Sequence, residues 1–264
     1  MYNYMKEKIS IVIVYFSGLD DLHKCVNSIC TNMHGFPYYI YIINNNPKQK
    51  IDNYFSNFER TKVITNNKNL GYSKATNIGA NCSSGDYILV LNPDIIILNN
   101  AIQKMKKFLD GNKEVGVVFP KLLNKDGNLQ YSCRTFPSFW TVLLRRSFLG
   151  KIPVLMKIVN KHLMKDFKHD EIKEVDWALG ACFLVRKKCL ENKIIFDERY
   201  FLYFEDVDFC LHLWKRGWKV VYYPDAEVIH NYKRESANKI FNFKTLEHIK
   251  SYIKFCLKNK QYNK

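Results

Sequence analysis

The sequence predicts an α/β fold with a doubly wound, mostly parallel sheet, and three observations indicate it. Apolar runs of strand length alternate with segments of helical periodicity over residues 1–100. The run GDYILVLNPDIIIL, residues 85–98, is apolar enough for a strand buried on both faces. Because the carboxyl ends of parallel strands share one edge, polar residues there should converge on a ligand crevice. Four expected strands end in such residues: Ser17, Asn44, Asn66 and Asn92.

The first hundred residues form a βα repeat, which favours right-handed crossovers between parallel strands. We expect four strands, at residues 10–16, 38–43, 62–65 and 85–92. We expect helices between them, at about residues 20–31, 51–58 and 72–82. Asp20 and Asp21 are suited to cap the first helix. In the third helix, Ala75, Gly79 and Ala80 are small enough to allow close packing.

The second half mixes short strands with amphipathic helices. We expect strands at residues 115–119, 176–186, 218–223 and 228–230, and a hairpin turn at residues 124–127. Residues 139–168 alternate apolar and basic residues at helical spacing, which is also typical of an ordinary surface helix. Residues 240–258 predict a last helix, with Lys250, Lys254 and Lys258 away from its apolar face. That face comprises Leu246, Ile249, Ile253, Cys256 and Leu257.

Asp94 is the first candidate for chemistry. Pro93 has no N–H to give to a ladder, so the preceding strand should stop there and leave Asp94 at its carboxyl end. A carboxylate at that position can hold a divalent cation, and the cation can hold a diphosphate. Taken alone, Asn-Pro-Asp is equally compatible with a simple turn.

A second candidate lies in the stretch FDERYFLYFEDVDF, residues 196–209. Glu205, Asp206 and Asp208 stand among aromatic residues, which would raise the pKa of a carboxyl group and suit it to act as a general base. These acids would also favour the dipole at a helix N-terminus, and both interpretations can hold. His230 ends the last strand, and a lone His is more often a packed core residue than a ligand.

Charge separates the chain into basic and near-neutral parts. The formal net charge is +16, and residues 101–170 carry 14 Lys/Arg against 5 Asp/Glu. Residues 233–264 carry 9 against 2, whereas residues 1–100 and 171–232 are close to neutral. Such basic segments suit nucleic acid, anionic lipid or phosphorylated ligands. A non-catalytic nucleic-acid-binding protein is therefore one alternative, although the near-neutral strand-end crevice argues against nucleic acid.

Several function classes find no support in the sequence. No apolar run reaches the length of a membrane span, and the N-terminus lacks a signal-peptide pattern, so we expect a cytoplasmic protein. The eight cysteines show no metal-binding spacing, which favours scattered reduced thiols. Neither G-x-G-x-x-G nor a P-loop sequence is present, which argues against a dinucleotide-binding fold or a P-loop NTPase.

Four blocks, in this order, resemble family 2 glycosyltransferases, the inverting GT-A type, and within them the rhamnosyltransferase-like branch. The blocks are IVIVYFSGLDDL (11–22), NLGYSKATNIG (69–79), LNPD (91–94), and VDWALGACFLVRK through FDERYFLYFEDVDFCLHLWKRGWKVVYYPDAEVIH (175–230). The resemblance implies a nucleotide-sugar donor, a divalent cation (Mn²⁺ or Mg²⁺) and one catalytic base. Asp94 then matches the second Asp of a D-x-D motif, with Asn92 in place of the first. His230 resembles an additional metal ligand, which replaces its interpretation as a core residue.

The same resemblance assigns the remaining site residues. Asp206 resembles the base, and we place the acceptor beside Glu205 and Tyr203. Asn44 stands where many relatives have an Asp that reads the nucleotide, so the nucleobase stays open. Lys233 and Arg234 could clamp the diphosphate from a mobile loop. The nucleotide-sugar site is assigned to Tyr15, Ser17, Asn44, Gly71, Lys74, Asn92, Asp94, Trp177, Gly180, Lys233 and Arg234.

The resulting expectation is an inverting, metal-dependent glycosyltransferase with a GT-A domain at residues 1–232. Residues 8–98 form its nucleotide-sugar-binding half, residues 99–232 its acceptor and catalytic half, and residues 233–264 a basic C-terminal helical extension. The expected donor is dTDP-rhamnose, with UDP-hexose or UDP-galactofuranose as alternatives. The expected acceptor is a lipid-linked or cell-surface polysaccharide. Because two amphipathic segments carry lysines, we expect peripheral binding to an anionic membrane at the inner face of the cell membrane.

Overall fold

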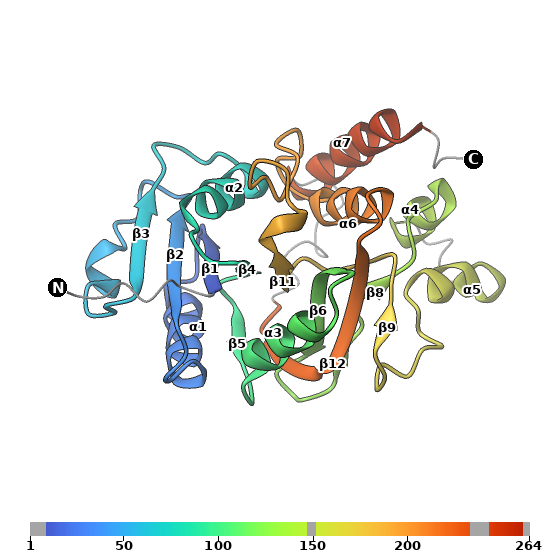
Figure 1. The fold of residues 1–264 in the computed structure, drawn as a ribbon. Coiled ribbons are helices and arrows are strands. Elements are labelled where there is room, and N and C mark those ends of the chain that lie inside the picture. The colour runs from blue at the N-terminus through green and yellow to red at the C-terminus, as the bar shows by residue number, and fades with distance from the viewer. Residues whose placement is uncertain (1–8, 147–151, 233–242, 261–264) are drawn as a thin grey trace.

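A mixed sheet of ten strands runs through the computed structural model, which describes residues 9–146, 152–232 and 243–260 (Figure 1). Its order is β3-β2-β1-β4-β11-β6-β12-β5, with β7 added to β6 and β9 to β12. The first four strands are parallel: β1 (Ile9–Tyr15), β2 (Tyr38–Asn44), β3 (Thr61–Thr65) and β4 (Tyr87–Leu91). Their alternation with helices confirms the predicted βα repeat.

The second half of the sheet is mixed because β11 is inserted antiparallel between β4 and β6. The strands are β5 (Ile95–Ile97), β6 (Val115–Leu123), β7 (Leu129–Gln130), β9 (Lys173–Glu174), β11 (Cys182–Arg186) and β12 (Lys219–His230). A separate two-stranded sheet pairs β8 (Cys133–Arg134) with β10 (Trp177–Ala178). The predicted hairpin turn joins β6 to β7.

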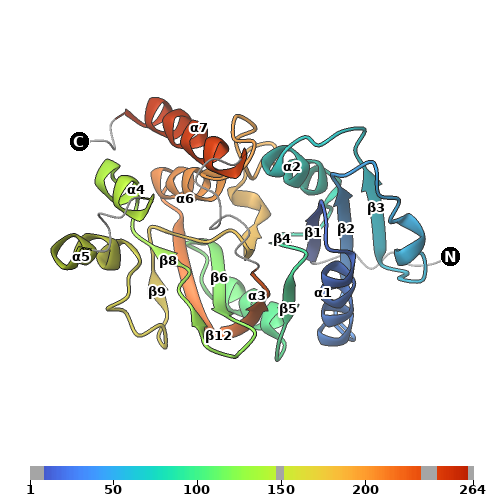
Figure 2. The same ribbon diagram turned by 180° about the vertical axis from the view of Figure 1, so that it is seen from behind.

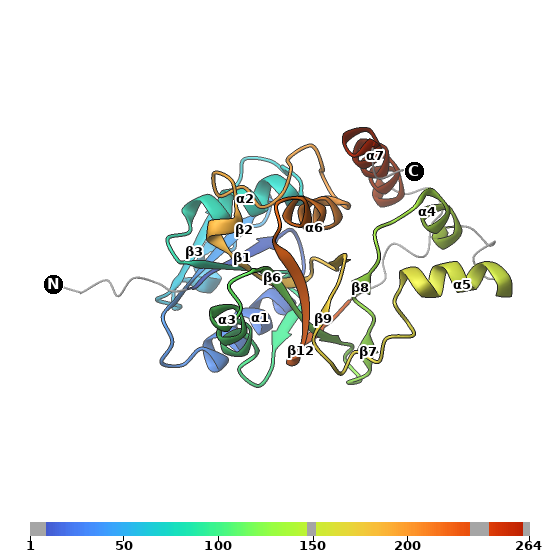
Figure 3. The same ribbon diagram turned by 45° about the vertical axis from the view of Figure 1, so that its right-hand side comes forward.

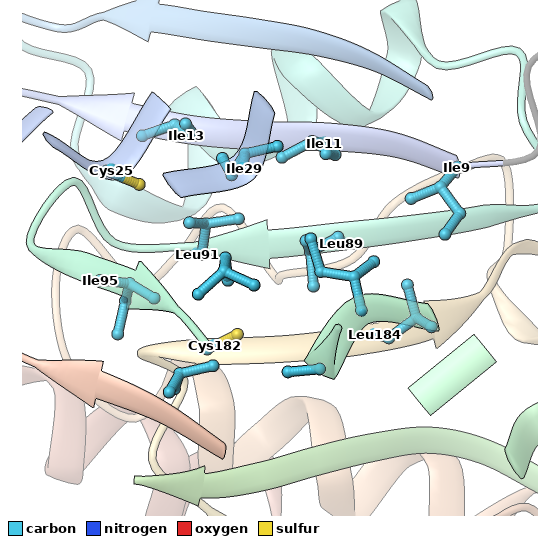
Figure 4. Packing of buried hydrophobic residues seen from close by; sticks show 14 of the residues in the cluster. Ile9, Ile11, Ile13, Cys25, Ile29, Leu89, Leu91, Ile95, Cys182 and Leu184 are labelled. Carbon is cyan, nitrogen blue, oxygen red and sulfur yellow. The ribbon is translucent and has the colours of Figure 1, made fainter. Parts of the chain in front are cut away.

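Helices cover both faces of the sheet, as expected of a doubly wound fold (Figure 2). The helices are α1 (Leu19–Asn32), α2 (Tyr72–Cys82), α3 (Ala101–Gly111), α4 (Phe139–Arg146), α5 (Pro153–His162), α6 (Glu205–Lys215) and α7 (Phe243–Lys258), with short 3₁₀ turns η1 (Asp52–Phe55) and η3 (Lys187–Cys189). Ile11 and Ile13 of β1 face the core beneath α1 and α3 (Figure 4), whereas Val12 and Val14 face α2 and α6. The period of two along β1 therefore places one helical layer on each face.

Close packing of α2 depends on Gly79, as its small size predicted. A Cβ at this position would lie 2.4 Å from Cγ1 of Val12, so only glycine allows the helix this near to β1. Close packing fixes the N-terminus of α2 at the carboxyl edge of the sheet, where Asn92 also lies.

Several element boundaries differ from the prediction. Residues 51–58 contain only the 3₁₀ turn η1, and β12 runs unbroken over the two strands that we expected. The expected strand at 176–186 is split into β10 and β11, because the N–H of Gly180 bonds to the side chain of Asp206 instead of joining a ladder. Gly18, with φ 85°, is the N-cap of α1, so Asp20 and Asp21 lie in the first turn of the helix and not at its cap.

The C-terminal helix α7 packs against the body through a narrow stripe that contains both polar residues and an aromatic residue. Its buried residues are Glu247, Ser251 and Phe255, and the hydroxyl of Ser251 donates to the carbonyl of Leu202 at 2.8 Å. Lys258 bonds to the carboxylates of Asp197 and Asp208, at 2.7 and 2.6 Å. Within the described ranges, none of the helices has the length and apolar character needed to cross a membrane.

Candidate functional site

The strand ends of the first half meet at one edge, as the sequence predicted. The N–H of Asn45 donates to the carbonyl of Tyr15 at 2.8 Å, and the N–H of Asn66 donates to the carbonyl of Asn44 at 2.9 Å. These bonds continue the ladders of β1, β2 and β3 beyond the strands. Ser17 lies just past β1, exposed to solvent.

Asn44 and Tyr15 organise the loop that follows β2. The side-chain amide of Asn44 donates to the carbonyl of Gln49 at 2.8 Å and to Oγ1 of Thr65 at 3.3 Å, and its oxygen accepts from the N–H of Asn46. The hydroxyl of Tyr15 donates to Oε1 of Gln49. Both side chains therefore shape residues 44–49, which border the crevice.

Asn45 holds a buried network that the sequence analysis missed. Its Oδ1 accepts from the side chain of Asn66 at 3.1 Å and from the N–H of Leu70 at 2.9 Å, and its Nδ2 donates to Asn69 at 2.8 Å. Nδ2 also lies 3.2 Å from the carbonyl of Gly71, the N-cap of α2. The network fixes the polar turn at residues 66–71.

The backbone at position 71 requires a glycine. Its φ is +83°, and a Cβ there would lie 2.7 Å from the backbone oxygen of Phe201. Lys74, three residues later, is half exposed, and its Nζ lies 3.9 Å from the carboxylate of Glu198. The N-terminus of α2 is thus held against the loop that precedes α6.

Asp94 and His230 come together across the antiparallel pairing of β5 with β12. Oδ1 of Asp94 lies 3.6 Å from Nε2 of His230. The other ring nitrogen, Nδ1, donates to Oε1 of Gln130 at 2.7 Å, and Nε2 of Gln130 donates to Asn124 at 3.1 Å. The amide of Gln130 is thereby oriented, and the imidazole keeps its lone pair on Nε2.

The Asp94–His230 pair fits a divalent cation. Nε2 of His230 is buried and has no hydrogen-bond partner among the residues the structure describes, and burial lowers the pKa of His230 to about 4. A neutral imidazole nitrogen facing a carboxylate oxygen is a common pair of metal ligands, and Gln130 would keep the imidazole in the tautomer that such a site needs. No cluster of three or more His, Cys, Asp or Glu is found in the described part of the chain.

Asp206 sits in the first turn of α6, and backbone groups hold its carboxylate. Oδ2 accepts from the N–H of Gly180 at 3.1 Å, and Oδ1 accepts from the N–H of Val207 at 2.9 Å. A Cβ on Gly180 would lie 3.2 Å from Cβ of Asp206, so the backbone at this glycine lies close to the Asp206 side chain. Burial raises the pKa of Asp206, while these N–H groups and the guanidinium of Arg134 lower it.

The backbone conformation just before α6 orients the side chains of Glu205 and Asp206. Tyr203 and Phe204 have φ values of 69° and 66°, a conformation that non-glycine residues adopt rarely. Two such residues in succession at a helix N-terminus store strain, which is typical of functional sites. They orient Glu205 and Asp206 toward the same region.

Glu205 is buried, and its Oε2 has no hydrogen-bond partner in the described ranges. Burial and the charge of Asp206 raise the pKa of Glu205 well above its usual value. Asp208, by contrast, is bound by Lys258 at 2.6 Å and by Asn259 at 3.1 Å. Unlike Glu205 and Asp206, Asp208 therefore helps to attach α7 to the body of the protein.

Tyr72 connects the two chemical stretches, and the sequence analysis did not single it out. Its hydroxyl donates to Oδ1 of Asn92 at 3.2 Å and lies 3.5 Å from the carbonyl of Gly180. Burial raises the pKa of Tyr72, and the charges of Glu205, Asp206 and Asp94 raise it further. Tyr72 thus lies within electrostatic reach of both Asp94 and Asp206, and its place directly after the polar turn was the available signal.

A cavity of about 520 Å³ adjoins Asp206 and is enclosed by residues of α4, α5, α6 and α7. Trp177 and Tyr203 line it together with Glu205, and the indole of Trp177 donates to the carbonyl of Thr135 at 2.9 Å. Arg145, His162, Lys244 and His248 line it too. Lys233 and Arg234, which we assigned to the diphosphate, lie outside the described residues.

Comparisons with known proteins show the family of this chain. Residues 10–168 match the glycosyl transferase family 2 domain. The N-acetylglucosaminyl-diphospho-decaprenol L-rhamnosyltransferase of Mycobacterium tuberculosis is 28% identical over 210 residues, covering 74% of this chain and 67% of that protein. Rhamnosyltransferase WbbL of Escherichia coli is 30% identical over 171 residues, covering 64% of this chain and 61% of that one.

The fold is also found among solved structures. GalNAc-T7, crystallised with UDP, GalNAc and Mn²⁺, superposes with a TM-score of 0.66 at 17% identity. The alignment covers 97% of this chain but only 48% of GalNAc-T7. The chain therefore spans about two thirds of its Mycobacterium relative and about half of this structural neighbour. With the family domain matched over more than half its length, the chain belongs to glycosyl transferase family 2 and is a glycosyltransferase similar to the rhamnosyltransferases.

Proposed function

We propose that this glycosyltransferase is inverting and metal-dependent, and that it transfers rhamnose from dTDP-rhamnose to a lipid-linked saccharide. The observation that carries the proposal is Nε2 of His230, which has no hydrogen-bond partner in the described ranges and faces Asp94 at 3.6 Å on the crevice edge. The names of the two rhamnosyltransferase relatives support rhamnose as the sugar, and the name of the Mycobacterium relative supports a diphospho-lipid acceptor.

The donor side of the site uses the strand-end residues. Asp94 and His230 hold the divalent cation, Mn²⁺ or Mg²⁺, and the GalNAc-T7 complex with UDP and Mn²⁺ supports this choice. When bound, the cation supplies positive charge for the departing diphosphate. The nucleotide sugar lies along Tyr15, Ser17, Asn44, Gly71, Lys74, Asn92, Trp177 and Gly180, with Lys233 and Arg234 as further contacts to the diphosphate.

Asp206 acts as the base for the acceptor hydroxyl. Burial raises its pKa toward the range of a useful base, while Gly180, Val207 and Arg134 keep enough stabilisation for the carboxylate to form. Glu205 contacts a second hydroxyl of the acceptor, and Tyr203 forms part of the cavity wall. One base suffices for one inversion, so the mechanism needs no carboxylate nucleophile.

Successive segments of the chain take different parts in binding and catalysis. Residues 8–98 bind the nucleotide sugar, residues 99–232 supply the base and the acceptor cavity, and the C-terminal extension closes that cavity through Lys244, Thr245 and His248 of α7. The enzyme meets its lipid-linked acceptor at the inner face of the cell membrane. Family membership favours this enzyme over a nucleic-acid-binding protein, and UDP-hexose or UDP-galactofuranose are the alternative donors.

The test is a donor screen on the purified protein. Melting temperature is measured with each sugar nucleotide, with and without Mn²⁺ or Mg²⁺, since a ligand at 100 times its Kd stabilises by about 2.7 kcal/mol. We expect dTDP-rhamnose to raise Tm only when the metal is present. A larger, metal-dependent shift with a UDP-sugar would replace the donor, and no shift with any sugar nucleotide would contradict the proposal.

A further inference from the structure

The exposed apolar side chains of this protein are concentrated at one end. Twelve of the eighteen large apolar side chains that are exposed in the described ranges lie on α4, on α7, and on α5 with its N-cap residue. These helices lie together at the end of the molecule opposite β3, in all three views (Figures 1, 2 and 3). Single exposed apolar residues need no explanation, but a gathering of this kind marks an interaction surface.

Helix α7 shows the pattern most clearly, because its apolar face points away from the body. Five of its residues repeat at intervals of three or four along one stripe and are 47–63% exposed: Phe243, Leu246, Ile249, Ile253 and Leu257. The opposite stripe of Glu247, Ser251 and Phe255 is the one that packs. A surface helix normally buries its apolar stripe, so this one is oriented for a partner outside the chain.

Helices α4 and α5 continue the same surface. Phe139 and Trp140 begin α4 with more than half of each side chain exposed, and Val154 and Ile158 lie one turn apart on α5. Tryptophan is a common residue where an apolar and an aqueous phase meet. Residues of α4, α5 and α7 also line the cavity beside Asp206, so the exposed surface surrounds the acceptor side of the site.

The excess of basic residues around this surface indicates which kind of partner could cover it. Residues 139–168 carry seven Lys/Arg against one Asp, and residues 243–260 carry five Lys against one Glu. A second copy of the chain would bring the same positive charge onto the surface, which is unfavourable. An anionic lipid surface offers both an apolar phase for the stripe and negative charge for the lysines.

We propose that α4, α5 and α7 form a membrane-docking surface that inserts apolar side chains into the headgroup region of an anionic bilayer. This rests on the proposed function, because a lipid-linked acceptor would then reach the cavity of Asp206 from the surface on which the enzyme sits. Insertion also refines the sequence-based expectation of attraction by Lys250, Lys254 and Lys258. Lys254 donates to the carbonyl of Arg199 at 2.6 Å and Lys258 binds Asp197 and Asp208, so these two lysines hold α7 on the body.

The test is vesicle co-sedimentation of a double variant on α7 and of a control variant at a residue of matched exposure. The full-length protein is mixed with phosphatidylcholine vesicles, with and without phosphatidylglycerol, at about 0.1 M and about 1 M NaCl. We expect stronger binding to the anionic vesicles than to the neutral ones. Salt should weaken the part of this binding that comes from the lysines, and the part that comes from inserted apolar side chains should remain at about 1 M NaCl. Ile249→Glu with Ile253→Glu should lower the bound fraction at least about tenfold, as the loss of inserted Ile side chains implies. Ile194→Glu, at a residue equally exposed (47%) but outside the three helices, should bind like wild type.

Three results would overturn the docking surface. They are no binding of wild type to either vesicle, unchanged binding of the double variant, and a wild-type dimer in light scattering that the double variant converts to a monomer. Trp140→Glu, on α4, provides a second variant whose binding should also fall. Melting temperatures establish that each variant is folded.

A transfer assay with a soluble acceptor separates this inference from the proposed function. Ile249 and Ile253 do not line the cavity, so the double variant should transfer sugar to a soluble acceptor at the wild-type rate. Vesicle binding without any sugar transfer would contradict the proposed function and leave the docking surface standing. Sugar transfer without vesicle binding would contradict the docking surface and leave the proposed function standing.

Discussion

Nε2 of His230 lies 3.6 Å from Oδ1 of Asp94, although the two residues are far apart in the chain. The pairing of Ile95 with His230 in the β5–β12 ladder creates this proximity, and Gln130 then sets the tautomer of the imidazole. A buried ring nitrogen without a hydrogen bond is costly unless a ligand completes it. The pair therefore gives the metal hypothesis a specific test.

Asp94→Ala and His230→Ala should each remove most of the metal-dependent donor binding. Each substitution deletes one of the two protein ligands, and loss of a ligand weakens a metal site more than loss of an outer-shell partner, which typically costs 10–100-fold. The measurement is the Tm shift produced by donor with Mn²⁺. Glu59→Ala, at an exposed carboxylate, is the control and should keep the full shift. Equal shifts in all three variants would remove the metal from this pair.

Asp206→Asn should lower turnover by roughly 10²–10⁴-fold, the usual contribution of a positioned base, and leave donor binding nearly unchanged. The amide keeps the shape of the carboxylate but cannot accept the proton. Asp208→Asn is the matched control, since Asp208 is occupied by Lys258 and Asn259, and it should reduce stability more than turnover. Near wild-type transfer by Asp206→Asn would point to Glu205 as the base.

Glu205→Gln should stabilise the protein increasingly as pH rises. Burial and Asp206 raise the pKa of Glu205 above its unfolded value of about 4.3, so the folded chain holds a proton that the unfolded chain has lost. Stability is thus full below that value and is lost as pH rises toward the folded pKa. The variant lacks this titration, so its Tm should exceed that of wild type by at least about 2 °C at pH 7 and by less at pH 4.

Thermal unfolding across this pH range, with Glu198→Gln as control, makes the comparison. Glu198 is half exposed, and its variant should show no gain that grows with pH. A constant difference between Glu205→Gln and wild type at every pH would mean that Glu205 is ionised in the folded protein.

Gly180→Ala should lower turnover roughly tenfold, because the new methyl group would lie 3.2 Å from Cβ of Asp206 and displace the base by a few tenths of an ångström. Gly111→Ala, at the end of α3, meets no atom within 4 Å and should keep full activity. Steady-state kinetics on both variants would decide. Wild-type turnover in Gly180→Ala would show that the position of Asp206 is not tightly constrained.

Local chemistry made part of the site predictable from sequence. Pro93 fixed the end of a strand and so placed Asp94, and the aromatic stretch around Asp206 signalled a buried carboxylate. The role of His230 could not be derived from its neighbours, because its partners Asp94 and Gln130 are brought to it by strand pairing.

Long-range structure explains what the sequence did not reveal. Asn45 bonds to residues more than twenty positions away, so nothing near it in the chain signals its network. For α7 the periodicity defined an apolar and a polar face. Which face packs depends on Leu202, Asp197 and Asp208, and these lie on segments that the helix pattern does not include.

The insertion of β11 between β4 and β6 also dictates when the protein can complete its fold. Leu91 pairs with Cys182, so one edge of β4 stays unpaired until the ribosome has added a segment 91 residues further along the chain. Until then, a nascent chain presents the open edge of a buried, apolar strand, which is an aggregation hazard. The matched family domain ends at residue 168, before β11 begins. A fragment cut at that boundary should therefore precipitate, whereas one extended past Arg186 gains the strand that closes β4.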